Sequence, residues 1–161
     1  MDRAGHFGGS LLLFYAILYA WAPNIDTVQS LALSLVAAVI AAAMSLKQDE
    51  DKDFLWGVFH RSWITHSLFT VLVATVGVYL LCETILKAGP LALYAAIAVF
   101  SATMSHVLLD SLTKKGVPLY GPVDDTMRGL RWFKSSNLIL NYTFLAAGVL
   151  MALLYYRIIV V

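Results

Sequence analysis

The sequence predicts an all-α integral membrane protein, a bundle of about five transmembrane helices that form a single domain over residues 1–161. Of the 161 residues, 60% are hydrophobic and only 13% are charged, whereas about 25% of the residues of a soluble domain are charged. The apolar residues gather into five segments, each close to the roughly 20 residues that cross a bilayer as a helix. The predicted helices are residues 7–22, 28–46, 64–86, 91–112 and 138–156.

The first segment, residues 7–22, is the shortest of the five. Its Gly8-Gly9 start predicts close packing against a neighbouring helix, because small residues let two helix backbones approach. A signal peptide is the alternative interpretation, since Arg3 precedes the segment and Ala20-Trp21-Ala22 resembles a cleavage site.

The four connections differ in length. Residues 23–27 and the turn at Gly89-Pro90 are short, so each predicts a pair of antiparallel neighbours. The other two connections, residues 47–63 and 113–137, are long and contain most of the polar residues.

The distribution of basic residues predicts the orientation. With five spans, the N-terminus and both long loops share one side of the membrane, and this side holds nine of the eleven lysines and arginines. The positive-inside rule places that side in the cytoplasm of a plasma (inner) membrane protein. The nine residues are Arg3, Lys47, Lys52, Arg61, Lys114, Lys115, Arg128, Arg131 and Lys134.

The net charge of the chain is only +1, which does not favour nucleic acid as a partner.

All four histidines fall at this same side of the predicted bundle. The stretch from His60 to Ser67 contains two of them, and His106 precedes Asp110 by four residues, which places both on one helix face. A site with both imidazole and carboxylate ligands suits Zn²⁺, Mn²⁺ or Fe²⁺, and of these we expect Zn²⁺. The candidate ligands, enough for two ions, are His6, Asp49, Asp51, His60, His66, His106 and Asp110.

Each candidate also has a simpler interpretation. Asp49 and Asp51 belong to an acidic run of the kind that is usually a solvated loop. Ionisable groups inside apolar segments are costly and are either functional or paired with each other. A purely structural pair of Asp110 with His66 or His106 is therefore the alternative to a metal site.

These motifs resemble the YdjM-like family of membrane-bound metal-dependent hydrolases. The resemblance covers residues 1–136 and rests on His6, on the Asp49-Glu50-Asp51 sequence and on the two histidine motifs. The order of these residues is also, more distantly, similar to that of the zinc-dependent phospholipase C and P1 nuclease group, which hydrolyse phosphoesters. Family members often have a downstream Glu, where this chain has Ser135-Ser136-Asn137.

The resemblance implies a metal-dependent phosphoesterase that acts on a phospholipid or another membrane-associated phosphorylated molecule at the cytoplasmic interface. A bidentate contact from Arg61 would hold the phosphate, and Asp49 or Asp51 would act as ligand or general base. The alternative is a non-enzymatic membrane protein, a transporter or regulatory partner, whose His/Asp cluster is a proton relay or a structural tie. The predicted substrate-binding residues are Arg61, Thr65, Ser67 and Lys114.

Overall fold

The computed structural model describes residues 1–21, 27–47 and 62–159. Five of its helical segments are long and apolar enough to cross a membrane, so the prediction of an all-α membrane bundle is confirmed. The elements are α1 (Arg3–Trp21), α2 (Val28–Lys47), the short α3 (Trp63–His66), α4 (Leu68–Leu80) with one π-helical turn η2 (Leu81–Ile85), α5 (Pro90–Ser111) and α6 (Leu138–Tyr155).

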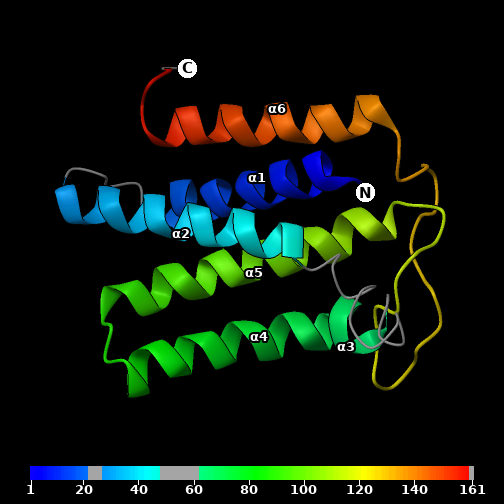
Figure 1. Cartoon of the computed structure of the whole chain (residues 1–161), viewed down its shortest axis with the longest axis horizontal. Coiled ribbons are helices and arrows are strands. Elements are labelled where there is room, and N and C mark those ends of the chain that lie inside the picture. Colours follow the sequence, from blue (N-terminus) through cyan, green and yellow to red (C-terminus); the bar gives the residue numbers. More distant parts are fainter. Residues whose placement is uncertain (22–26, 48–61, 160–161) are drawn as a thin grey trace.

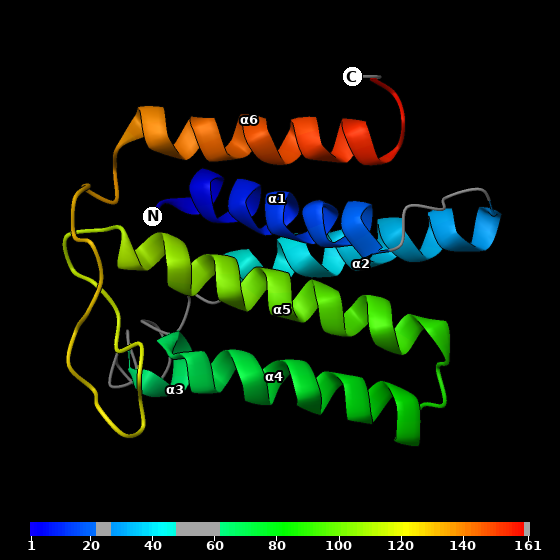
Figure 2. The same cartoon turned by 180° about the vertical axis from the view of Figure 1, so that it is seen from behind.

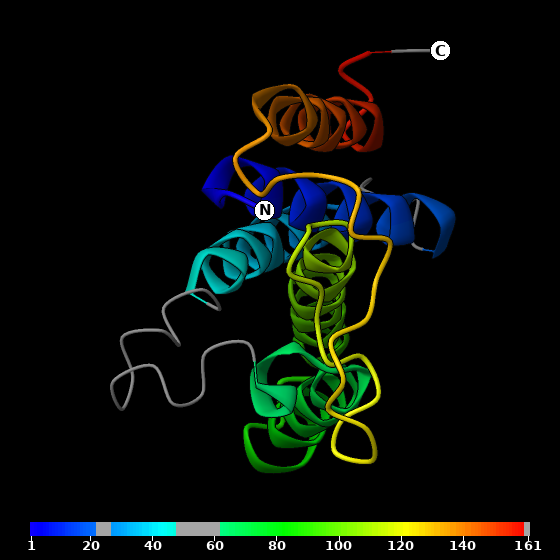
Figure 3. The ribbon, with the colours of Figure 1, turned by 90° about the vertical axis from the view of Figure 1, so that its right-hand side faces the viewer.

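The long helices lie roughly parallel or antiparallel to one another (Figures 1 and 2). Helices α6, α1, α5 and α4 follow one another across the molecule, and α2 lies beside α1 and α5. The start of α1, the end of α5, the start of α6 and α3 all lie at one end of the bundle, together with the connection 113–137 (Figures 1 and 3). We call this end the loop end.

Helix α1 starts at Arg3, four residues before the predicted position, and it packs against α2, α5 and α6. A Cβ atom added at Gly148 of α6 would lie 2.4 Å from the carbonyl oxygen of Gly8, and one added at Gly8 would lie 2.3 Å from the Cα of Leu145. The backbones of α1 and α6 are therefore in direct contact, which confirms the close packing predicted from Gly8-Gly9.

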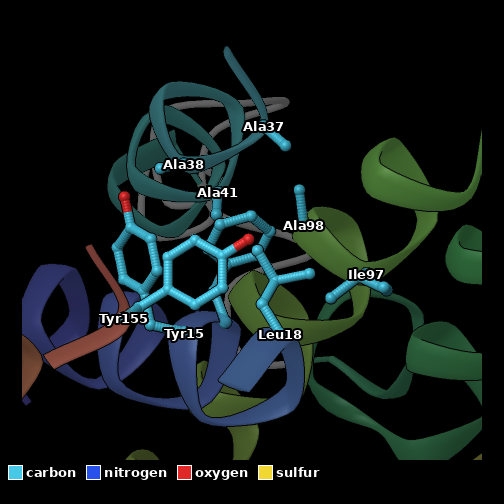
Figure 4. Close-up of a cluster of buried hydrophobic side chains, with 9 residues drawn as sticks. Tyr15, Leu18, Ala37, Ala38, Ala41, Ile97, Ala98 and Tyr155 are labelled. Carbon is cyan, nitrogen blue, oxygen red and sulfur yellow. The ribbon is translucent and has the colours of Figure 1, made fainter. Parts of the chain in front are cut away.

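A cluster of buried side chains joins α1, α2, α5 and α6 (Figure 4). Tyr15 and Leu18 of α1 pack there with Ala41 of α2, Ala98 of α5 and Tyr155 near the end of α6. The small alanines let α2 and α5 approach the aromatic residues of α1 and α6.

The outward faces of the outer helices are apolar. Val39 of α2, Leu72 of α4 and Ile139 of α6 expose 68%, 61% and 83% of their surface, respectively. Water would penalise this much exposed hydrocarbon, whereas lipid does not. This surface agrees with a bundle surrounded by bilayer.

The segment predicted as one helix over residues 64–86 is divided at Ser67, which is extended (φ −117°, ψ 161°). The Ser67 side chain accepts a hydrogen bond from the backbone N–H of Thr70 at 3.2 Å, and the Leu68 N–H donates to the Leu119 carbonyl at 3.1 Å. Serine favours such a capping position because its hydroxyl satisfies a free N–H of the new helix. The break leaves His66 as the last residue of α3.

The connection 113–137 is held by backbone hydrogen bonds between its two halves. The Lys114 N–H donates to the Phe133 carbonyl at 2.8 Å, and Val117 and Arg128 exchange two bonds of 3.0 and 2.8 Å. A Cβ added at Gly121 would lie 2.0 Å from the Cβ of Trp63, so the connection also rests directly on α3. It therefore covers the loop end with ordered chain.

Candidate metal centre

Three histidines and one aspartate converge at the loop end. His6 comes from α1, His66 from α3, and His106 and Asp110 from α5. The side chains of all four are fully buried. Because burying an ionisable group is costly unless it is paired or bound to a metal, this convergence marks a functional or strongly paired site.

The Asp110 carboxylate lies at the centre of this His/Asp cluster. Its Oδ1 atom is 3.3 Å from Nε2 of His6, and its Oδ2 atom is 3.8 Å from Nε2 of His66 and 3.9 Å from Nε2 of His106. The rings of His6 and His106 are stacked, with centroids 3.8 Å apart and an interplanar angle of 10°. All three imidazoles thus direct Nε2 toward the same carboxylate.

Local packing brings the histidines to this position. His106 and Asp110 are one turn apart on α5. A Cβ added at Gly9 would lie 2.5 Å from Cδ1 of Leu109, so α1 packs closely against α5 one turn from His6. The Thr65 hydroxyl lies 2.7 Å from Nδ1 of His66, which orients the opposite nitrogen of the ring toward Asp110.

The N-terminus also reaches the cluster, which the sequence analysis did not anticipate. The Met1 amino group contacts Oδ1 of Asp110. Asn141 of α6, which is fully buried, accepts a hydrogen bond from the Asp2 N–H at 3.3 Å, and its side-chain amide donates to the Ser135 carbonyl at 2.9 Å. The sequence signal that could have identified Asn141 is its position as a polar amide inside an apolar segment, because such groups are costly in a membrane.

The structure describes some of the other predicted site residues and not the rest. Asp49, Asp51, His60 and Arg61 lie outside the described residues. The hydroxyls of Thr65 and Ser67 make the local contacts given above, and Lys114 is exposed on the connection 113–137. The catalytic and substrate-binding roles assigned to these residues stay predictions.

The described ligand set suits one divalent ion. One ligand atom each from His6, His106 and Asp110 lies within 4.8 Å of the other two. Two ligands of one tetrahedral zinc ion are about 3.4 Å apart, because bonds of about 2.0–2.2 Å meet at a tetrahedral angle. The side chains would therefore have to draw together by up to about 1.4 Å to coordinate one ion, and neutral imidazole with carboxylate is a common zinc donor set.

Five apolar helices around a buried His/Asp cluster define a polytopic membrane protein with a candidate metal centre. The YdjM inner membrane protein family matches residues 1–161, and the chain belongs to this family. The family places the protein in the inner membrane. No curated protein and no solved structure matches the chain, so the distant similarity to phospholipase C and P1 nuclease gains no support.

Proposed function

We propose that the protein is a metal-dependent hydrolase of the inner membrane, a phosphoesterase that acts on a membrane-associated phosphorylated molecule. The main support is the fully buried cluster of His6, His66, His106 and Asp110, in which every imidazole directs Nε2 to one carboxylate. Phosphoester hydrolysis is the reaction class suggested only by the resemblance of the motif order to the phospholipase C and P1 nuclease group.

His6, His106 and Asp110 would hold the ion, with His66 beside them. Asp49, Asp51 and His60 are the further ligands that the sequence predicts. When bound, a divalent ion supplies Lewis-acid activation of water and of a phosphoryl oxygen.

The remaining roles are those that the sequence predicts for a base and for substrate-binding residues. Arg61 would hold the phosphate by a bidentate contact, since its planar guanidinium matches phosphate geometry. Asp49 or Asp51 would accept the proton of the attacking water. Ser67 and Lys114 would bind the substrate, and Thr65 would keep the His66 ring oriented through the contact at Nδ1.

The loop end would face the cytoplasm, as the distribution of basic residues predicts. The end of α6 lies opposite the loop end (Figure 1), so the C-terminus would be outside. An alkaline phosphatase fused after Tyr156 should be active, and the same reporter inserted in residues 113–137 should be inactive. The reverse pattern would contradict this orientation.

A second candidate function is non-enzymatic, with the cluster as a structural tie or proton relay in a transporter or regulatory protein. The observation that favours it is the contact between the Met1 amino group and Asp110, which already gives the carboxylate a cationic partner. In this case the histidines would stabilise the loop end without turnover.

The decisive experiment is hydrolysis of phosphatidic acid and of a phosphodiester lipid by purified protein in mixed micelles, with and without Zn²⁺ or Mn²⁺. We expect turnover only with metal. Arg61→Ala should lower kcat/KM by about 10- to 100-fold, because a hydrogen bond to a charged group contributes roughly 1.5–3 kcal/mol. Arg157→Ala, at the opposite end of the bundle, is the matched control. Bound metal without turnover would favour a sensing or structural site instead.

A further inference from the structure

A cavity of about 440 Å³ lies between α1, α5 and α6, directly beside the His/Asp cluster. Its volume falls within the roughly 300–1,000 Å³ of ordinary ligand pockets. Its walls include Gly9, Leu13 and Ala16 of α1, Leu108 of α5 and Phe144 of α6.

The residues that line the cavity favour a hydrocarbon chain as its occupant. Its two polar residues, Ser105 and Ser111, direct their hydroxyls back to the carbonyls of Ala102 and Leu108 on their own helix, at 3.2 and 2.6 Å. A water molecule in a cavity requires two to four polar partners, and this lining supplies few. An apolar chain is therefore a better occupant than water or a sugar.

The cavity neighbours the cluster along α5 and α1. Ser105 and Leu109, which line it, directly precede His106 and Asp110 on α5, so the two pairs lie on adjacent faces of the same two turns. On α1 the lining extends to Ala16, ten residues beyond His6. That is about 15 Å along the helix axis, or half of the roughly 30 Å hydrocarbon core, which is the depth of one leaflet.

A basic residue, Arg131, adjoins the cavity lining. Leu130 of the connection 113–137 lines the cavity, and the backbone N–H of the next residue, Arg131, donates to the carbonyl of the lining residue Ser111 at 3.3 Å. Arg131 is exposed, and no carboxylate of the described residues lies within ion-pair distance of its guanidinium.

The neighbouring Arg128 is already neutralised, because its guanidinium lies 2.5 Å from the Asp124 carboxylate. The Thr126 backbone N–H and Arg128 lower the pKa of Asp124 to about 2, so this carboxylate is charged at neutral pH. The Arg131 guanidinium donates to the Met127 carbonyl and keeps its full positive charge, so it can attract an anionic headgroup at this depth.

We infer that the cavity binds one acyl chain of an anionic phospholipid, with the phosphate of its headgroup between Arg131 and the His/Asp cluster. The cleavage of that phosphate rests on the proposed function, but binding of the chain does not. The cavity would thus make a long apolar chain a requirement for tight binding, which a soluble phosphomonoester does not meet.

The test uses phosphatidic acid with a diazirine on one acyl chain, added to the full chain in detergent micelles, and maps the cross-linked peptides by mass spectrometry. We expect labelling concentrated on the lining residues of α1 and α5. Ala16→Trp, which fills the cavity, should reduce it about tenfold, equivalent to 1.4 kcal/mol of binding free energy. Ala146→Trp, on the exposed face of α6, is the matched control and should leave labelling unchanged.

Leu108→Trp is a second variant that does not depend on the core, because Leu108 is 50% exposed at the rim of the cavity. It should reduce labelling in the same way. Labelling spread evenly over all lipid-facing helices, or unchanged in both Ala16→Trp and Leu108→Trp, would overturn the inference.

The same preparations separate this inference from the proposed function. Labelling of the cavity without hydrolysis in the presence of metal would leave the lipid site standing and contradict the phosphoesterase. Hydrolysis with labelling unaffected by Ala16→Trp and Leu108→Trp would support the phosphoesterase and contradict the lipid site.

Discussion

Asp110→Asn is expected to remove stoichiometric metal from protein purified with excess Zn²⁺ or Mn²⁺. Asp110 lies within 4 Å of Nε2 of all three histidines, and the substitution keeps its size but removes the negative charge and the better ligand oxygen. Loss of a direct ligand should weaken metal binding more than the 10- to 100-fold typical of an outer partner. Elemental analysis and a competition titration with a chelating dye measure the change.

Two further variants test whether the loss of metal is specific to the cluster. Glu83→Gln removes a carboxylate from η2, far along the chain from the histidines, and should leave the metal content unchanged. Thr65→Val removes the hydroxyl 2.7 Å from Nδ1 of the candidate ligand His66 and should weaken metal binding by about 10- to 100-fold, as loss of the hydrogen-bond partner of a ligating histidine does.

The alternative structural tie predicts a different outcome for the same variants. Wild-type protein would then contain less than one equivalent of Zn, Mn, Fe, Co or Ni, and a chelator would not change its Tm. Asp110→Asn would instead lower the Tm, because it leaves the buried Met1 amino group without its anionic partner. This result would contradict the metal centre.

Gly148→Leu is expected to prevent α1 and α6 from packing. Even a Cβ at this position would lie 2.4 Å from the Gly8 carbonyl oxygen, so the helix backbones must separate. Overpacking costs about 1–3 kcal/mol where side chains can adjust, and here backbone must move, so we expect a loss of at least this size. Thermal unfolding in detergent and size-exclusion chromatography measure it.

The control is Gly77→Leu on α4, where an added Cβ meets nothing within 4 Å. Replacing a helical glycine there should be neutral or stabilising by up to about 1 kcal/mol. Because α1 also contains His6, Gly148→Leu should lower the metal content together with the Tm. Equal Tm values for the two leucine variants would show that α1 and α6 do not pack this closely.

Hydrophobic length and the spacing of the charged residues predict both the class of protein and the end of the bundle at which its chemistry lies. Hydrophobic length is a local property, so five spans follow from composition alone, and counting spans places His6, His66, His106 and Asp110 at one membrane level. The structure brings these four residues together as the shared level predicts. It does not describe Asp49, Asp51, His60 and Arg61.

The rotation of each helix about its axis, and therefore which residues are in contact, depends on tertiary packing. In a bilayer, lipid and protein interior are similarly apolar, so the hydrophobic pattern of a span does not specify its buried face. The central position of Asp110, the break at Ser67 and the anchoring of the N-terminal segment by Asn141 depend on packing between distant helices. The apolar cavity beside the cluster has the same origin, since three helices and the connection 113–137 form it.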